Sequence, residues 1–241
     1  MPFPTSDVNF DFSDSMGEVN PLLSDVLTSL LERNQKFATG LERDHRELLK
    51  TLSKGQKPTV CWIGCSDSRV PEGSVCQTYP GEIFTIRNVA NQWNEKDDSA
   101  AAALTFAIEA LGVEDVIIVG HTSCGGVSAA IAGASSGPPA ETASSSLGRY
   151  LVPLTKHAYQ IKQEATEELS PPAFVKKLTT ENVKKQLENL KASEVIQRNW
   201  TTGESTLVPG KVCKKVRLHG WVHDISTGKL HDLNVSVAPP S

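Results

Sequence analysis

The chain has 241 residues, 39% of them hydrophobic, and a formal net charge of −4. This length suffices for one substantial core or two small ones, and the scattered Lys and Arg residues form no basic block of the kind that binds nucleic acid. No apolar run approaches the length of a membrane span. We therefore expect a globular protein that binds neither nucleic acid nor a membrane.

The basic residues and the cysteines bear on cellular location. The first Lys or Arg of the chain is Arg33, which argues against a secretory signal and against an Arg-rich transit peptide. We therefore expect a cytoplasmic protein whose five cysteines are reduced. Their odd number also fits poorly with a pure disulfide framework.

The N-terminal part of the chain is predicted to be an arm. Residues 1–20 are polar, acidic and rich in Ser, Asp and Phe, which is typical of a flexible segment. Apolar residues then recur at helical spacing, so Pro21–Ala38 is predicted to be an amphipathic helix and Arg43–Leu52 a second helix. Such an arm either covers a face of the sheet or reaches across to a partner subunit.

Strands and helices then alternate along the chain. Short β-branched runs predict strands, and longer segments with helical spacing predict helices. In chain order these elements are strand Thr59–Ile63, strand Glu82–Val89, helix Ser99–Leu111, strand Val116–Val119 and helix Cys124–Ile131. This alternation indicates a parallel sheet flanked by helices.

The last third of the chain contains an insertion, a helix and a hairpin. Gly133–Gly148 consists almost wholly of Gly, Ala, Ser, Pro and Thr, so we interpret it as a surface insertion. Apolar spacing predicts a helix over Glu181–Arg198. Alternation from Val216 to Val222, followed by a turn and a return over Leu230–Val235, predicts a terminal hairpin on a sheet edge.

These elements combine into an α/β fold. Residues 21–241 are expected to form a single domain with a central, mainly parallel β-sheet flanked by helices, an N-terminal helical arm and a C-terminal edge hairpin. In open α/β sheets, ligands bind beyond the carboxyl ends of the strands. We therefore expect the functional residues at that edge of the sheet.

Two short motifs fall at this edge. Cys65-Ser-Asp67-Ser-Arg69 comes after the first predicted strand, and His121-Thr-Ser-Cys124 after the third. Zn²⁺ prefers thiolate and imidazole ligands, so Cys65, His121 and Cys124 are candidates for holding one zinc ion with an open fourth position. The alternative is a satisfied histidine with two buried cysteines, which the presence of both motifs disfavours.

Asp67 and Arg69 allow three interpretations. They can form an ordinary surface ion pair, which contributes little to stability. Beside a zinc ion, Asp67 can instead orient a metal-bound water or accept its proton, while Arg69 holds the carboxylate ionised and aimed. In the third interpretation, Asp67 ligates the metal and closes the site.

The other cysteines and histidines are predicted to lie outside the site. Cys61 falls inside the first strand and is expected in the core, whereas Cys76 and Cys213 have no partnered spacing. The remaining histidines are expected to be exposed or at an interface: His45, His157, His219, His223 and His231.

The two motifs resemble the signature of the β-class carbonic anhydrases, which is Cys-x-Asp-x-Arg followed by His-x-x-Cys. The resemblance also includes Gln56-Lys57-Pro58 before the first strand, the segments Pro80–Phe84 and Arg87–Asn91, and the C-terminal segment Gly220–Leu230. It covers residues 21 to 233, apart from the segment 133–148, which departs from the family pattern together with the acidic arm.

The resemblance implies an activity and a cofactor. A β-class carbonic anhydrase is an enzyme, a lyase that reversibly hydrates carbon dioxide to bicarbonate and a proton by means of zinc-bound hydroxide. The implied cofactor is one Zn²⁺ per chain, with Cys65, His121 and Cys124 as its ligands. The implied partner is the small-molecule substrate, CO₂ or bicarbonate.

The resemblance also implies roles for further residues. The implied catalytic residues are Asp67, Arg69 and Gln56, with Gln56 entering the pocket of a dimer partner. The implied substrate-binding residues are Phe84, Val89, Gly125 and Gly126. Because the family's sites lie at a subunit interface, we expect a homodimer or a tetramer built from dimers.

Some members of the family also have a pocket in which bicarbonate closes the site. It is built from a Trp, an Arg and a Tyr; Trp62 and Arg87 match, and Phe106 stands where we expect the Tyr. The missing hydroxyl predicts weak closure by bicarbonate, so that Asp67 stays paired with Arg69. The alternative is that Trp62 and Phe106 are simply core aromatics.

Two other functions remain open at this point. One is an enzyme on the same fold that hydrolyses a CO₂ analogue such as carbon disulfide. The other is a non-enzyme, a zinc-stabilised bicarbonate sensor or scaffold, although the open fourth coordination position and the neighbouring Asp–Arg pair argue against it. Testing both substrates separates the two enzymes.

Overall fold

A computed structural model describes residues 22–166 and 169–240 of the chain. The chain divides into two units, Met1–Gln56 and Lys57–Ser241. The predicted arm at 1–20 and the residue Pro21 lie outside the described residues. Within the described part, none of the helices has both the length and the apolar character that a membrane crossing requires.

The first unit contains two helices, α1 (Asp25–Asp44) and α2 (Arg46–Leu52). Helix α1 starts after Ser24, whose hydroxyl accepts a hydrogen bond from the backbone N–H of Leu27 and so caps the helix. It continues beyond the predicted end at Ala38. Leu41 is buried, but the other large apolar side chains of the helix are exposed: Val26, Leu27, Leu30, Leu31 and Phe37.

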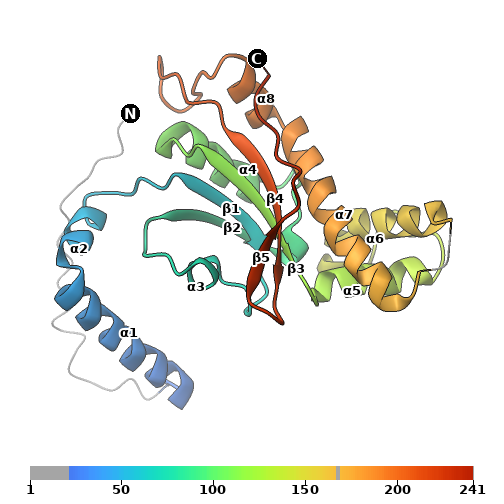
Figure 1. Cartoon of the computed structure of the whole chain (residues 1–241), viewed down its shortest axis with the longest axis horizontal. Helices are drawn as coiled ribbons and strands as arrows, with labels where there is room; N and C mark the ends of the chain where they lie inside the picture. Colours follow the sequence, from blue (N-terminus) through green and yellow to red (C-terminus); the bar gives the residue numbers. More distant parts are fainter. Residues whose placement is uncertain (1–21, 167–168, 241) are drawn as a thin grey trace. The chain divides into compact units, whose positions relative to one another are not determined.

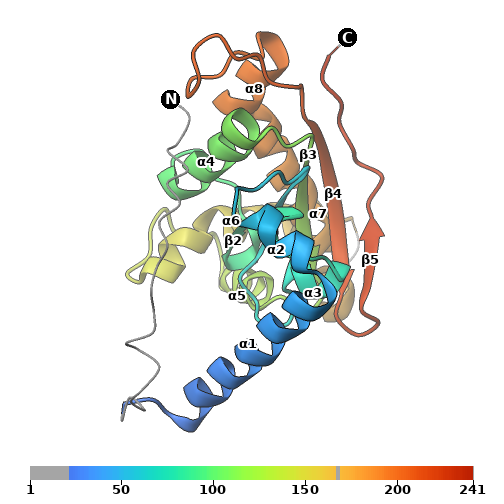
Figure 2. The same ribbon diagram turned by 90° about the vertical axis from the view of Figure 1, so that its left-hand side faces the viewer.

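The second unit is built on a five-stranded sheet in the order β2-β1-β3-β4-β5 (Figures 1 and 2). The strands are β1 (Val60–Cys65), β2 (Ile83–Asn88), β3 (Asp115–His121), β4 (Arg217–Asp224) and β5 (Lys229–Asp232). The first four are parallel, and β5 pairs antiparallel with β4 at the edge. The predicted α/β fold with an edge hairpin is therefore confirmed, with β4 as an inner strand beside β3.

Helices connect and flank these strands. They are α3 (Glu72–Cys76), η2 (Val89–Asn91), α4 (Asp98–Thr105), η3 (Phe106–Leu111), α5 (Gly125–Ser135), α6 (Ser146–Glu164), α7 (Pro171–Ala192) and α8 (Glu194–Thr201). The helix predicted over 99–111 is α-helical as far as Thr105 and then continues as a π-helical turn. The helix predicted over 181–198 is two helices, because the chain is extended at Ser193.

The surface insertion predicted over Gly133–Gly148 is too long at both ends. Helix α5 continues to Ser135 and buries Ala134, and α6 starts after Ser145, whose hydroxyl caps it. The prediction took small residues as a sign of a loop, but small residues also suit a helix face that packs against a close neighbour. At Gly133, an added Cβ would come within 2.9 Å of Thr155. The connecting segment is 136–145.

The two faces of the sheet pack against different partners. Cys61, fully buried as predicted, lies on the face that packs against α4, α7 and α8. Trp62 lies on the other face, where its ring meets Trp221 edge-on at a centroid distance of 6.4 Å. In β2, Phe84 pairs with Cys61 and Arg87 with Gly64. Because side chains alternate along a strand, Phe84 shares the face of Cys61, and Arg87 that of Trp62.

Candidate metal centre

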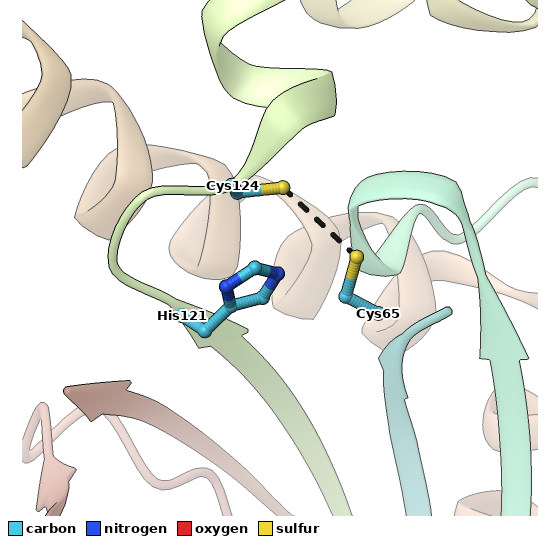
Figure 3. Close-up of side chains that lie close together, drawn as sticks. All are labelled: Cys65, His121 and Cys124. Carbon is cyan, nitrogen blue, oxygen red and sulfur yellow. Dashed lines mark hydrogen bonds between the residues drawn. The ribbon is translucent and has the colours of Figure 1, made fainter. Parts of the chain in front are cut away.

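The three predicted metal ligands meet at one edge of the sheet. Cys65 is the last residue of β1, and His121 is the last residue of the neighbouring parallel strand β3. Cys124 follows a short turn as the N-cap residue of α5. Both strands run two residues further than predicted, so Cys65 and His121 are held by the sheet rather than by loops. Figure 3 shows the three side chains facing one another.

The distances between these ligand atoms fit a tetrahedral ion. All three lie within 4.8 Å of one another, and the Sγ atoms of Cys65 and Cys124 are 4.0 Å apart. Two thiolates at about 2.3 Å from a tetrahedral Zn²⁺ are themselves about 3.8 Å apart. The cysteine pair therefore needs little adjustment to hold such an ion.

The His121 ring supplies an independent indication of a metal. Its Nδ1 lies 2.9 Å from the carbonyl oxygen of Thr122, which fixes Nδ1 as the donor and Nε2 as the atom with a free lone pair. The residue is 1% exposed, and Nε2 is buried without a hydrogen-bond partner among the described residues. A buried, unpartnered imidazole nitrogen facing two thiols is what a metal ion would satisfy.

The contact between the two thiols shifts their pKa values in opposite directions. The hydrogen bond from Cys124 lowers the pKa of Cys65, and the Ala90 N–H adds to this effect against the cost of burial. The same hydrogen bond to Cys65, together with burial, raises the pKa of Cys124, which the Gly126 N–H at the start of α5 opposes. A bound cation would take the place of the remaining proton and hold both groups as thiolates.

Asp67 lies beside the ligands and is paired with Arg69. Arg69 donates from Nε to Oδ1 at 2.9 Å and from Nη2 to Oδ2 at 2.7 Å, and its backbone N–H also donates to Oδ1. Asp67 Oδ2 lies 3.9 Å from His121 Nε2. The hydrogen bonds from Arg69 hold the pKa of Asp67 well below its usual range, although burial opposes this. The carboxylate therefore stands ionised at the edge of the ligand cluster.

The predicted substrate-binding residues fall into two groups. Val89 packs against the cluster that contains Cys65 and Cys124, and Gly125 and Gly126 form the first turn of α5. Helix α5 approaches closely here: a Cβ at Gly126 would come within 2.8 Å of the Ala90 Cβ and 3.2 Å of Val89 Cγ1.

Phe84 and Gln56 are placed differently. Phe84 packs with the other core cluster, its ring 6.1 Å from that of Phe106. Gln56 is the last residue of the first unit and is exposed. Their roles in substrate binding stay predictions.

The predicted bicarbonate pocket is not formed within this chain. Trp62 and Arg87 share one face of the sheet, and Arg87 donates to the carbonyl oxygen of Cys65 at 2.9 Å. Phe106 packs against Phe84 on the opposite face. The grouping of Phe106 with Trp62 is therefore wrong, because it neglected the alternation of side chains across the sheet.

Two histidines are less exposed in this chain than predicted, although an interface position, the other alternative for His223, stays a prediction. His223 is 6% exposed because its strand, β4, is an inner strand of the sheet. His157 is half-buried, and its Nε2 atom is fully covered. The sequence also gave no signal for Ser123, whose carbonyl oxygen accepts from Arg69, or for the Ala90 N–H, because any residue can supply a backbone atom.

Known proteins resemble the chain in sequence and in fold. A family model described as carbonic anhydrase matches residues 60–230. A carbonic anhydrase of Candida albicans is 31% identical over 218 residues, which cover 87% of this chain and 69% of the relative. The chain belongs to the β-class carbonic anhydrases.

Two solved structures of this family have the same architecture. The β-carbonic anhydrase CafA of Aspergillus fumigatus is 33% identical with a TM-score of 0.72, and the match covers 87% of this chain and 91% of CafA. A β-carbonic anhydrase of Sordaria macrospora is 24% identical with a TM-score of 0.75, covering 89% of this chain and 100% of that one, which shows the fold alone. As a carbonic anhydrase, the chain is a lyase that interconverts carbon dioxide and bicarbonate.

Proposed function

We propose that this carbonic anhydrase holds one Zn²⁺ per chain on Cys65 Sγ, His121 Nε2 and Cys124 Sγ and uses it to hydrate CO₂. The observation that carries the proposal is the convergence of these three atoms within 4.8 Å, with Nε2 buried and unpartnered among the described residues. When bound, zinc is a Lewis acid that lowers the pKa of water to about 7. Three protein ligands leave the fourth position for the reaction.

Asp67 and Arg69 orient the reacting oxygen. A carboxylate oxygen has two lone pairs, and among the described residues Oδ2 accepts one hydrogen bond, from Arg69 Nη2 at 2.7 Å. Its remaining lone pair can accept a hydrogen bond from a donor next to the metal ligands. Because its pKa is held low, Asp67 acts at neutral pH as an acceptor and not as an acid.

The neighbouring groups suit a small apolar substrate and an anionic product. Val89 offers an apolar wall for CO₂. The N–H groups at the start of α5, at Gly125 and Gly126, are donors at the positive end of the helix dipole, where a bicarbonate oxygen is favoured. Gln56 of a partner subunit and Phe84 complete the pocket in this proposal.

The test is CO₂ hydration by the purified protein, followed by stopped-flow. We expect catalysis that disappears when a chelator strips the metal and returns when zinc is added. Carbon disulfide is the second substrate, for which we expect no hydrolysis. A metal-loaded protein that hydrates no CO₂ would overturn the proposal.

We also propose an assembly of dimers. The Sordaria macrospora enzymes are described as tetrameric, and the exposed apolar residues of α1 offer a surface for a second subunit. Deletion of residues 1–38 should give an unstable or monomeric protein in light scattering. A fully active monomer would contradict a site shared between subunits.

The proposed location is the cytoplasm. All five cysteines are free, and the two that ligate the metal must stay reduced, which suits a reducing compartment. Fractionation of cells that produce the tagged protein tests this; recovery from an oxidising compartment would contradict it.

A further inference from the structure

A cavity lies between α6, α7 and the segment 92–94, and none of the three metal ligands lines it. Figure 1 shows α6 and α7 beside each other. The cavity volume is about 210 Å³, below the range of about 300–1,000 Å³ that is typical of sites for drug-sized ligands. Its size therefore suits a small ion.

Three buried polar atoms of the lining residues have no partner among the described residues. They are Trp93 Nε1, the Tyr150 hydroxyl and His157 Nε2. Trp93 is only 4% exposed, and its backbone N–H is fixed by a hydrogen bond to Gln186 Oε1 at 2.8 Å. An indole N–H can only donate, so burying it without an acceptor costs free energy. Three such atoms around one cavity indicate a ligand that accepts hydrogen bonds.

The lining of the cavity is rich in basic side chains and has no acidic one. The basic residues are Arg149, Lys156 and Lys185. Lys156 pairs with Glu141 at 2.6 Å and Lys185 with Glu188 at 3.5 Å, but both carboxylates are highly exposed. Exposed pairs of this kind are weak and can exchange. The cavity thus combines a buried donor with basic side chains that are partly exposed.

We propose that this cavity, which none of the three metal ligands lines, binds a small oxyanion. Trp93 Nε1–H would donate to an anion oxygen, and Tyr150 and His157 would supply the other buried contacts. Arg149, Lys156 and Lys185 would balance the charge. Inorganic phosphate and the enzyme's own product bicarbonate are the two sources of such an anion.

The experiment uses the zinc-loaded enzyme at constant ionic strength and neutral pH. Calorimetric titration with inorganic phosphate, and separately with bicarbonate, is compared for wild type, Trp93→Phe and Lys185→Gln. Lys177→Gln is the matched control, because Lys177 is an exposed lysine of the same helix that does not line the cavity. Crystals soaked in selenate locate the anion by its anomalous signal, which separates this cavity from anions bound at the metal.

We expect a selenate peak in the cavity and a loss of affinity of about tenfold or more in Trp93→Phe, the size expected for one hydrogen bond to a charged group. Lys185→Gln should weaken binding, and Lys177→Gln should not. The anion that binds more tightly identifies the source. The proposal is overturned if no peak lies in the cavity, or if neither Trp93→Phe nor Lys185→Gln changes the affinity. Lys185 is exposed, so its variant stays informative even if Trp93→Phe does not fold.

Discussion

Two acid–arginine pairs in this molecule have similar chemistry and different surroundings. Asp67 pairs with Arg69 beside the metal ligands, and Glu109 pairs with Arg198 at 2.8 Å below the loop that follows α8. Glu109 Oε1 accepts from Arg198, whereas Oε2 accepts from the backbone and hydroxyl groups of Ser205, Thr206 and Leu207. Both oxygens of Glu109 are thus engaged within the chain. The Asp67 carboxylate, by contrast, accepts hydrogen bonds from Arg69 alone among the described residues, which leaves acceptor capacity facing the ligands.

The side chains of Glu109 and Asp67 also differ in how much of their surface is exposed. The side chain of Glu109 is 4% exposed and that of Asp67 is 17% exposed. Burial raises the pKa of Glu109, but hydrogen bonds from Arg198 and Thr206 outweigh it and hold that pKa below its usual range. An acid whose bonds are all internal stabilises the fold, while an acid with spare acceptor capacity next to a metal site can act on a ligand. The predictions below test this distinction.

The largest expected effect is the loss of the metal beside Asp67. Cys124→Ser should reduce metal content from near one zinc per chain to a small fraction, with a fall in activity of about hundredfold or more, beyond the usual cost of changing a residue that only supports a ligand. Elemental analysis and hydration rates measure both. Cys76→Ser is the control, because Cys76 is half-buried and lies outside the ligand cluster. Full zinc occupancy in Cys124→Ser would refute the ligand assignment.

Asp67→Asn tests the spare acceptor capacity directly. The variant should fold and keep its metal, because Asp67 is not one of the three ligands, yet lose activity by about a hundredfold. The amide has no charge for Arg69 to pair with, and it presents a donor where an acceptor is needed. Hydration rates at pH 8 give the result. Near-wild-type rates would show that this pair is as structural as that of Glu109.

Glu109→Gln should have the opposite profile. The free energy of unfolding should fall by about 1.5–3 kcal/mol, the value expected for hydrogen bonds to a charged group, while the folded enzyme keeps its hydration rate. Denaturant unfolding and stopped-flow assays measure the two effects. Glu204→Gln on the same loop is the control, because Glu204 is exposed. A loss of hydration rate without a loss of stability would contradict the purely structural role of Glu109.

The smallest expected effect is the pH dependence of the difference in unfolding free energy between wild type and Glu109→Gln. The pKa of Glu109 is lower in the folded state, so its stabilisation is fully present above the unfolded pKa of about 4.3 and is lost as the pH falls through the folded value. The stability gap between wild type and Glu109→Gln should therefore be constant near pH 7 and shrink below about pH 4. Unfolding curves at several pH values show this, and a gap that grows on acidification would contradict the assigned sign.

The two pairs also show which features a sequence reveals. Asp67 and Arg69 are two residues apart, next to Cys65 in one short motif, so local spacing was enough to predict the site. Glu109 and Arg198 are 89 positions apart, and only the packing of α8 against α4 and the π-turn brings them together. No periodic pattern encodes such a contact.

The errors have the same physical origin. Periodicity predicted the strands and their parallel arrangement, but not which face each side chain occupies relative to a distant helix. The family resemblance that grouped Phe106 with Trp62 matched residue types along the chain and likewise did not test which face of the sheet they occupy. His157 lies in a polar helix, and its partial burial arises from the neighbouring helix α7 and the segment at Trp93. The surface insertion predicted over Gly133–Gly148 was too long at both ends, because composition does not reveal whether small residues are exposed or tightly packed.

The close approach of α5 to η2 restricts the sequences that evolution or a mutant library can accept. Ala90 has a φ of +60°, so glycine would suit that position better than alanine. A side chain at 126 would collide with Ala90 and displace the helix start that carries Cys124, so random substitution at 126 alone should return glycine among active clones. The double change Gly126→Ala with Ala90→Gly removes the colliding methyl group. A side chain at 126 should therefore be accepted only together with glycine at 90, whereas Ala90→Gly alone needs no change at 126.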